Sequence, residues 1–454
     1  MRFHFIGVGG SGMSAVARLV AARGVDVTGS DKRRSAYFAA LEDAGVNVSQ
    51  GHDATAVDGA DVVVISTAVR EANEELARAR ELGIEVWHRS RALAWALEGR
   101  RLISVAGSHG KTTTSAMTAH ILHACGIDAS YAVGARVFGV EGAVAGGYGG
   151  SAEIAVVEAD ESDGSFLNYD TEIAIVLNVE PDHLDFFGSF EAVEAAFVSF
   201  ASAARVLIVC ADDPGAARVA DAVAGAGVRV VRYGVSPRPE GAGAADVVVG
   251  PRDVTWAERT MPLAVPVPGV HQRLNAAAAW CAAVEVGVEP EIAAQAVASF
   301  AGTGRRFELR GEVRGMRVID DYAHHPTEVA AVLAAARAAG AERLVVLFQP
   351  ALFSRTQALG EEFGRAMSID NAAVILAPVY GDREDPIPGV TSQVIADALT
   401  PGQGSTVELA DSLEDAAARA AASARPGDTV MTIGSGTVTQ AASWILDAWS
   451  KADG

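Results

Sequence analysis

The chain has few cysteines. Cys125, Cys210 and Cys281 are the only ones in 454 residues, and they lie far apart in apolar surroundings. This spacing excludes a disulfide framework and a cysteine-based zinc site, and it suits a reducing compartment with buried thiols. A secretory signal is also missing, because residues 1–10 run straight into a strand-and-turn pattern. We therefore expect a cytoplasmic protein.

Long apolar runs and positive charge are scarce as well. No stretch approaches the roughly 20 apolar residues that cross a bilayer, so we predict no membrane insertion. Acidic residues outnumber Lys and Arg by 57 to 36, which gives a net charge of −21. Such a charge disfavours nucleic acid as a partner. Lys32, Lys111 and Lys451 are the only lysines. Because lysine is so rare in this chain, its presence in the motif around Lys111 points to a function.

Half of the residues are hydrophobic, and the length exceeds that of one ordinary domain. Short apolar segments alternate with alanine-rich amphipathic ones almost throughout, which is typical of a parallel α/β protein. The first part of the chain predicts strands at 2–7, 25–29, 61–65 and 84–87 and helices at 11–23, 35–44 and 74–82. Further strands are predicted at 101–106, within 152–160, 172–180, 205–213 and 228–234, and at 308–313, 316–321, 343–348, 372–377, 405–409 and 428–433, with loops and short strands over 236–268.

A glycine loop follows the first predicted strand. Gly7, Gly9 and Gly12 form G-x-G-x-x-G before a helix, and Asp31 follows the next strand. Such glycines allow a pyrophosphate to approach the free N–H groups of the helix, and Asp31 could accept hydrogen bonds from a ribose. The loop predicts a nucleotide site but leaves the nucleotide open, with NAD as the default. Tight strand–helix packing is the structural alternative.

A second glycine loop follows the strand at 101–106. Its backbone N–H groups can converge on phosphate oxygens, a lysine can reach the β- and γ-phosphates, and a threonine hydroxyl suits magnesium. Two residues separate its glycines, where the usual phosphate loop has four. Lysine followed by three threonines is not expected of a mere packing turn, so we predict ATP binding. The loop comprises Gly107, Ser108, His109, Gly110, Lys111, Thr112 and Thr113.

Acidic residues and histidines follow three later strands. In an open α/β sheet, ligands gather outside the carboxyl ends of strands, and hard cations prefer oxygen ligands. We therefore predict Mg²⁺ binding there, although either acidic loop alone could simply be solvated. The clusters are Glu158, Asp160, Glu161 and Asp163; Glu180, Asp182, His183 and Asp185; and Asp320, Asp321, Tyr322, His324 and His325. Arg305, Arg306 and Arg355 add possible phosphate or carboxylate ligands.

These motifs together resemble the Mur ligases, which form amide bonds in peptidoglycan synthesis at the expense of ATP. The resemblance rests on GVGGSGMS, GSHGKTTT, EADESDGSFL, NVEPDHLDFF, DDYAHHP and FQP…SRT, which occur in this order over nearly the whole chain. It implies a Rossmann-like UDP-sugar domain (1–99), a central P-loop ATPase-like, mostly parallel α/β domain (100–303) and a Rossmann-like amino-acid domain (304–454). One glycine loop then serves UDP and the shorter one serves ATP.

Within the family, the resemblance is greatest to the branch that joins L-alanine to the lactyl carboxylate of UDP-N-acetylmuramate. It implies Lys111 as the phosphate lysine, Thr112, Glu158 and His183 as Mg²⁺ ligands, and His271, Asn275 and Arg306 near ATP. Tyr322, His324 and Arg355, with Asp321 beside them, match positions around the amino acid and the muramoyl carboxylate, with His183 or His324 as a possible base. Gly9, Gly10, Ser11, Gly12, Asp31, Ser66 and Thr67 fall where the family holds the UDP-sugar.

The chain departs from the family pattern at several positions, which include Ser435 and Thr437, where a relative can carry an acidic residue. Gln272 stands where Asn is usual, and Ala351 and Leu352 replace a His-Arg pair, so Arg355 must act without a second arginine. Three alternatives stay open: a related ligase that adds a peptide or another amino acid, an NAD-dependent oxidoreductase, and a non-catalytic binding module or regulatory ATPase. We expect a monomer or homodimer.

Overall fold

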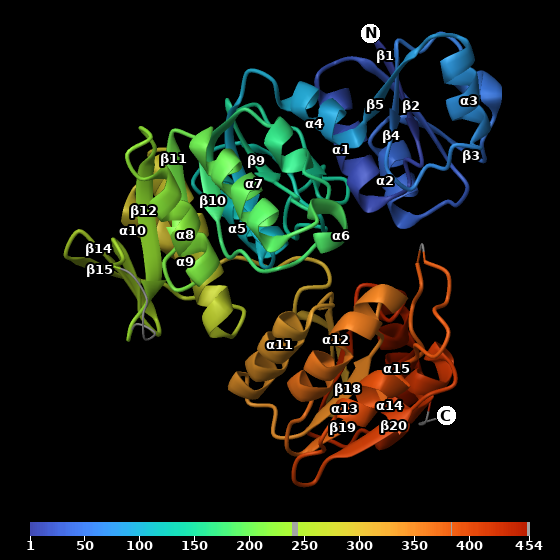
Figure 1. The fold of residues 1–454 in the computed structure, drawn as a ribbon, viewed down its shortest axis with the longest axis vertical. Helices are drawn as coiled ribbons and strands as arrows, with labels where there is room; N and C mark the ends of the chain where they lie inside the picture. Colours follow the sequence, from blue (N-terminus) through green and yellow to red (C-terminus); the bar gives the residue numbers. More distant parts are fainter. Residues whose placement is uncertain (238–243, 383, 452–454) are drawn as a thin grey trace. The chain divides into compact units, whose positions relative to one another are not determined.

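The computed structural model describes residues 1–237, 244–382 and 384–451 (Figure 1). The chain forms two compact units, one of residues 1–266 with 272–303 and the other of Val267–His271 with 304–454. Three largely parallel sheets carry the fold, so the predicted α/β class is confirmed. Within the described residues, no helix is both long and apolar enough to span a bilayer.

The N-terminal sheet of the first unit is parallel, in the order β3-β2-β1-β4-β5. β4 carries a continuous apolar run, and β1 is buried from Phe3 to Ile6 although it includes His4, which is the pattern of a sheet covered on both faces. β3 was not predicted, because its sequence NVSQ is short and polar. The elements are β1 Arg2–Ile6, α1 Ser11–Ala22, β2 Asp26–Asp31, α2 Ala36–Asp43, β3 Asn47–Gln50, η1 Ala54–Val57, β4 Val62–Ile65, α3 Glu74–Glu81, β5 Glu85–His88 and α4 Arg89–Leu97.

The central sheet of the same unit has the order β15-β14-β13-β12-β11-β10-β6-β9-β7-β8. Its middle is parallel, and antiparallel pairs close both ends. Its elements are β6 Arg101–Ala106, α5 Lys111–Ala124, β7 Ser130–Ala132, β8 Gly147–Tyr148, β9 Ile154–Glu158, η2 Ser165–Asn168, β10 Thr171–Val176, α6 Leu184–Phe187, α7 Phe190–Ser202, β11 Val206–Cys210, α8 Pro214–Val223, β12 Arg229–Val235, β13 Val247–Val249, β14 Asp253–Trp256, β15 Arg259–Pro262, α9 Val270–Glu285 and α10 Pro290–Val297. Short strands were predicted over 236–268, of which 238–243 lie outside the described residues.

The C-terminal unit contains a sheet in the order β16-β17-β21-β18-β19-β20. β16 and β17 form the predicted antiparallel hairpin, turning at Arg314 and Gly315, both with positive φ. The remaining strands are parallel and fully apolar at β18 and β19. The elements are β16 Glu308–Val313, β17 Met316–Asp321, α11 Pro326–Ala338, β18 Leu344–Phe348, α12 Phe353–Ala366, β19 Ala372–Leu376, α13 Gln393–Ala398, β20 Thr406–Leu409, α14 Leu413–Ser423, β21 Thr429–Ile433 and α15 Thr439–Lys451.

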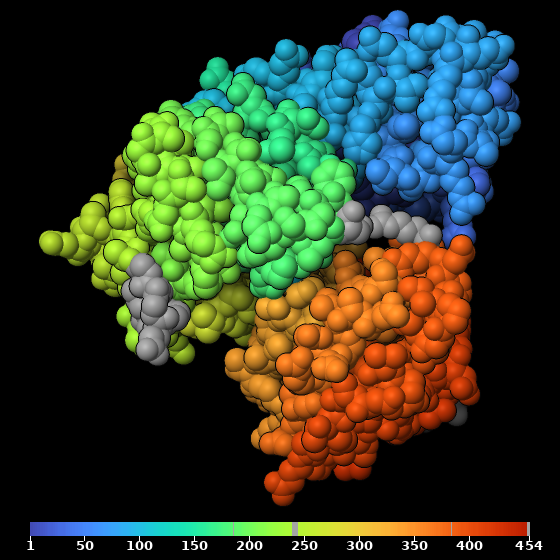
Figure 2. Space-filling view, in the orientation of Figure 1, coloured from blue at the N-terminus to red at the C-terminus, as the bar shows by residue number. Residues whose placement is uncertain are grey.

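Helix α1 packs directly on β8, so the N-terminal sheet adjoins the central one within the first unit (Figure 2). Glycines make this approach possible. A Cβ at Gly147 would lie 2.5 Å from the carbonyl oxygen of Ala15, and one at Gly149 would lie 2.3 Å from the Cβ of Ala22. The helix backbone therefore rests on a surface without side chains.

The substitution Gly147→Ala tests this packing. The added methyl group meets helix backbone, which cannot rotate away as a side chain would, so we expect the free energy of unfolding to fall by about 1–3 kcal/mol. Urea unfolding followed by circular dichroism measures the change. An unchanged transition midpoint would show that the α1–β8 contact tolerates a methyl group.

Candidate active site

The second glycine loop joins β6 to α5, and two of its residues need glycine. Gly107 and Gly110 have φ values of +145° and +85°. A Cβ at Gly107 would come within 3.0 Å of the Cβ of Leu177, and one at Gly110 within 2.8 Å of Oδ1 of Asn275. The backbone of residues 107–110 thus passes between the end of β10 and helix α9 and leads directly into the first turn of α5. Asn275, which the sequence placed near ATP, is buried beside this loop.

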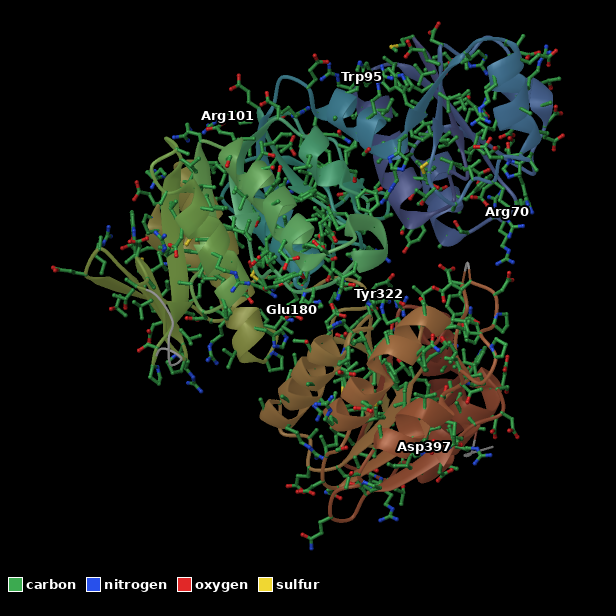
Figure 3. All side chains as sticks on the ribbon, viewed as in Figure 1. Arg70, Trp95, Arg101, Glu180, Tyr322 and Asp397 are labelled. Atoms are coloured by element: carbon green, nitrogen blue, oxygen red, sulfur yellow. The ribbon has the colours of Figure 1, made fainter. Side chains whose placement is uncertain are left out.

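Asn178 holds the loop in place, and sequence reasoning missed it. Its Oδ1 accepts a hydrogen bond from the backbone N–H of His109 at 2.7 Å, and its Nδ2 donates to the His109 carbonyl at 3.1 Å. The Ser108 hydroxyl oxygen accepts from the N–H of Glu180 at 2.9 Å; Glu180 is labelled in Figure 3. The available signal was the asparagine directly after the apolar run of β10.

Lys111 is tied to Glu161. Its Nζ donates to Glu161 Oε1 at 2.9 Å and to the Gly107 carbonyl at 2.6 Å. Burial alone would lower the pKa of Lys111, but the carboxylates of Glu161, Asp160 and Glu158 outweigh it and raise the pKa, so the ammonium stays charged. Glu161 is 2% exposed. Its Oε2 is buried and has no hydrogen-bond partner in the described part of the chain.

Oxygen donors and one imidazole gather beside Lys111. The Thr112 hydroxyl donates to Glu158 Oε1 at 2.8 Å, and the Gly134 N–H donates to Glu158 Oε2 at 2.5 Å. His183 Nε2 lies 3.9 Å from Glu161 Oε1, and His183 adopts a strained φ of +55°. The loop residues Thr112 and Thr113 are buried at the start of α5. The Thr112 hydroxyl and the Glu158 carboxylate are oxygen ligands of the kind that a hard divalent cation prefers.

The first glycine loop borders a cavity of about 890 Å³ in the N-terminal part of the first unit. Asp31 fastens this loop, because its Oδ2 accepts from the Gly9 N–H at 2.9 Å while its Oδ1 accepts from the Arg33 N–H at 3.0 Å. Arg70, labelled in Figure 3, lies on the cavity wall. The predicted residues that line the cavity are Gly7, Gly10, Ser11, Gly12, Asp31, Ser66 and Thr67.

In the C-terminal unit, Tyr322 lies among cationic groups. The guanidinium carbons of Arg305 and Arg306 lie 4.9 and 5.2 Å from its ring centre, and the His324 ring is 5.2 Å away in an edge-on arrangement. Tyr322 is labelled in Figure 3. Arg305 Nε also bonds to the buried Asp320 Oδ2 at 3.2 Å, whereas Arg306 Nη1 lies 3.8 Å from Glu328.

Asp321 accepts hydrogen bonds from backbone groups on both sides of Tyr322 in the structure. Its Oδ2 accepts from the Phe307 N–H at 2.7 Å, and its Oδ1 accepts from the Ala323 N–H at 2.8 Å. Burial raises its pKa to about 6, although Arg306 and these N–H donors act in the opposite direction. Asp321 therefore shapes the Tyr322 loop through its backbone contacts.

His324 is neutral at physiological pH. Burial lowers its pKa from 6.5 to about 4, even though Glu328 is nearby, and Arg355 lowers it further. Nδ1 donates to the Tyr322 carbonyl at 3.0 Å, which leaves Nε2 as an acceptor. His271, predicted near ATP, belongs to the C-terminal unit, and burial lowers its pKa too.

Three of the residues that depart from the family pattern, Gln272, Ala351 and Leu352, lie at buried or positive-φ positions. Gln272 is buried, and its Oε1 accepts from Asn275 Nδ2 at 3.5 Å. Ala351 is buried, and Leu352 precedes α12 with a φ of +70°, which places Arg355 in the first turn of that helix.

Each unit thus brings together part of the predicted set. The first unit contains Gly107–Thr113, Glu158, His183 and Asn275 around the second loop, and Gly7–Gly12, Asp31, Ser66 and Thr67 around the first. The second unit contains His271, Arg306, Asp321, Tyr322, His324 and Arg355.

The lowered pKa of His324 predicts a pH effect on stability. Between pH 6.5 and 4 the unfolded chain takes up a proton at this position that the folded chain does not, so stability that is present above pH 6.5 is lost as the pH falls toward 4. For His324→Gln we expect this part of the loss, up to about 3 kcal/mol, to be absent. Urea unfolding of both proteins at pH 7 and pH 4.5 measures it. The same pH dependence in both proteins would contradict a neutral, buried His324.

Comparisons with known proteins identify the family. Three family models match: "Mur ligase family, catalytic domain" over residues 2–101, "Mur ligase middle domain" over 105–283, and "Mur ligase, glutamate ligase domain" over 305–436. A UDP-N-acetylmuramate–L-alanine ligase of Paenarthrobacter aurescens is 49% identical, with 98% of this chain and 97% of that protein covered.

Two solved structures are similar over almost their whole length. A UDP-N-acetylmuramate–alanine ligase of Thermotoga maritima has a TM-score of 0.80 at 25% identity, with 100% of both chains covered. A murein peptide ligase of Psychrobacter arcticus has a TM-score of 0.71 at 25% identity, with 99% of this chain and 98% of that one covered.

Proposed function

The chain belongs to the Mur ligase family, and from this premise we propose how its residues join L-alanine to the lactyl carboxylate of UDP-N-acetylmuramate with the use of ATP. This activity is the one named for relatives that match nearly the whole chain. It serves peptidoglycan precursor synthesis. The NAD-dependent oxidoreductase considered from the first glycine loop has no support in these comparisons.

The observation that carries the proposal is the charged, buried Lys111 at the start of α5. A triphosphate on this loop would meet the N–H groups of residues 108–113 and the positive end of the helix dipole. Lys111 would then exchange part of its contact with Glu161 for the β- and γ-phosphates. Asn178 hydrogen-bonds to the backbone of His109 in this loop, and Asn275 lies close to Gly110.

In the first chemical step, an oxygen of the lactyl carboxylate attacks the γ-phosphorus of ATP. The bond from that phosphorus to the β–γ bridging oxygen breaks, which gives an acyl phosphate and ADP. Both reactants are anionic, so the ammonium of Lys111 and the guanidinium of Arg306 lower their repulsion and stabilise the charge that spreads during transfer.

In the second step, the neutral amine of L-alanine attacks the acyl carbon. The tetrahedral adduct then expels inorganic phosphate, which takes up the surplus proton of the nitrogen, and the amide is left. The ammonium of free alanine must first lose a proton. His324, neutral and with Nε2 as an acceptor, can hold the amine beside Tyr322, and Arg355 can bind the alanine carboxylate. His183 is the alternative proton acceptor.

Thr112 and Glu158, which are hydrogen-bonded to each other, and His183, which lies 3.9 Å from Glu161, are the residues that would hold Mg²⁺. Bound there, it would neutralise phosphate charge. The UDP moiety would occupy the N-terminal cavity, against Gly9–Gly12, Asp31, Ser66 and Thr67.

The proposed function assigns one substrate to each of three domains. Residues 1–99 would bind the UDP-sugar, residues 100–303 would bind ATP, and residues 304–454 would bind alanine. The three cysteines are free thiols, which suits a reducing cytoplasm, where we place the enzyme.

Phosphate release from ATP tests the proposed function. The assay uses L-alanine, glycine, L-serine and a murein-type peptide as acceptors, each with and without UDP-N-acetylmuramate. Rapid release is expected only with the sugar nucleotide and L-alanine together. Glycine should be weaker by about 10- to 200-fold, because one methyl group contributes only about 1–3 kcal/mol to binding. Preference for the peptide would favour the related ligase activity, and release without the sugar nucleotide would favour a simple ATPase.

The substitution Lys111→Ala separates the two nucleotide sites. It removes the charge that faces the phosphates, so we expect ADP formation to fall by at least about 100-fold while UDP binding stays unchanged. Lys451→Ala, at the exposed end of α15, is the matched control. Normal turnover of the Lys111 variant would overturn the assignment of ATP to this loop.

A further inference from the structure

A buried carboxylate lies beneath the N-terminal cavity, and the reaction described above does not use it. Glu75, in α3, has a fully buried side chain. Its Oε1 accepts from the Asp53 N–H at 3.1 Å, and its Oε2 accepts from the Ser30 hydroxyl at 2.5 Å. His4 Nε2 lies 3.5 Å from the same Oε2. Burial raises the pKa of Glu75, but hydrogen bonds from His4, Ser30 and Asp53 outweigh it and lower the pKa, so the carboxylate stays ionised.

His52 connects this carboxylate to the cavity. Its Nδ1 lies 3.2 Å from Glu75 Oε2 and 3.0 Å from the Ser30 hydroxyl oxygen. The ring also lines the cavity, together with Asp31, Ser66 and the first glycine loop. His52 is 12% exposed. The imidazole therefore reaches from a buried charge to the space where a nucleotide would bind.

When His52 carries a single ring proton, its hydrogen bonds determine which nitrogen holds that proton. An ionised carboxylate only accepts hydrogen bonds. Ser30 donates its single hydroxyl hydrogen to Glu75, so its oxygen can only accept from His52. Both partners of Nδ1 thus require a hydrogen there. Nε2 is consequently a lone-pair acceptor, and it is the nitrogen that a molecule in the cavity can meet.

We propose that His52 reads the base of the bound nucleotide: its Nε2 accepts a hydrogen bond from the N3–H of uracil. This inference rests on the proposed function, which assigns a uridine nucleotide to this cavity. Cytosine has a bare acceptor at N3, so its lone pair would face that of Nε2. Uridine is therefore favoured over cytidine by the position of one proton.

The fixed tautomer favours the base over the ribose as the partner of His52. A ribose hydroxyl can donate or accept, so it would bind either tautomer equally well. Only a ligand atom of fixed polarity gains selectivity from a histidine whose proton is held in place. Uracil N3 is such an atom. Burying a carboxylate costs free energy because it loses its hydration. This cost is explained if Glu75 keeps the His52 proton on Nδ1 and so leaves Nε2 as an acceptor.

Glu75→Gln reverses the polarity without removing the ring. The Asp53 backbone N–H always needs an acceptor at the Oε1 position, so the glutamine NH₂ must occupy the Oε2 position. There it donates toward Ser30 and His52 Nδ1. The His52 proton then moves to Nε2, which becomes a donor and favours cytosine N3 over uracil N3–H.

Isothermal calorimetry with UDP and with CDP tests the proposal on the full chain. The wild type should bind UDP at least about 10-fold more tightly than CDP, the effect of one lost hydrogen bond with an unpaired partner. His52→Ala should bring the two affinities within about 2-fold of each other. Glu75→Gln should reduce the preference for UDP over CDP or reverse it. Glu81→Gln, on the same helix with its side chain 70% exposed, is the control and should leave the ratio unchanged.

Other outcomes overturn the inference in distinguishable ways. If His52→Ala weakens UDP and CDP equally, His52 contacts ribose or phosphate and does not read the base. An unchanged ratio in a folded Glu75→Gln would exclude control by the tautomer. If that variant does not fold, the result for His52→Ala, a change at the cavity wall, still decides whether the base is read. If the wild type binds neither nucleotide, the assignment of UDP to this cavity fails, and with it the proposed function.

Discussion

The ammonium of Lys111 is the charge around which the site is organised. It is buried at the start of a helix, where burial and the positive end of the helix dipole both disfavour a cation. The structure compensates with Glu161 at 2.9 Å and with Asp160 and Glu158 nearby. A nucleoside triphosphate would offer the same compensation with more negative charge, and its oxygens could also accept hydrogen bonds from the loop N–H groups. The lysine is thus held ready by groups that a phosphate can replace.

Strand order explains why these groups meet. β10, β6 and β9 are neighbours in the central sheet and all run parallel. Their carboxyl ends therefore deliver residues 107–113, 158–161 and 178–183 to one edge of the sheet, although up to 76 positions separate them along the chain. The N-terminal sheet follows the same principle, because the ends of β1, β2 and β4 border the N-terminal cavity, to which we assign UDP. The parallel strands thus bring the residues of both candidate sites together. At each site, glycine would allow a ligand to come close to the loop backbone.

Much of this could be predicted from the sequence. The apolar runs gave the α/β class and most strands. The second glycine loop and the two acidic clusters that follow it lie after the carboxyl ends of neighbouring strands of the central sheet, as the sequence predicted. β3 was missed because NVSQ has no apolar pattern. Asn178 and the pairing of Lys111 with Glu161 could not be predicted, because hydrogen-bond partners depend on register and loop conformation rather than on composition. The chain of contacts from Glu75 to His52 likewise joins three separate segments. The roles assigned to the site residues and the domain boundaries remain predictions.

A crystal structure with a non-hydrolysable ATP analogue and Mg²⁺ tests the central claim most directly. We expect the triphosphate to lie on residues 107–113, with Lys111 Nζ within hydrogen-bonding distance of the β- and γ-phosphate oxygens and its contact with Glu161 lengthened or shared. A triphosphate bound elsewhere, or a Lys111 that keeps Glu161 as its sole anionic partner, would contradict this account of the site.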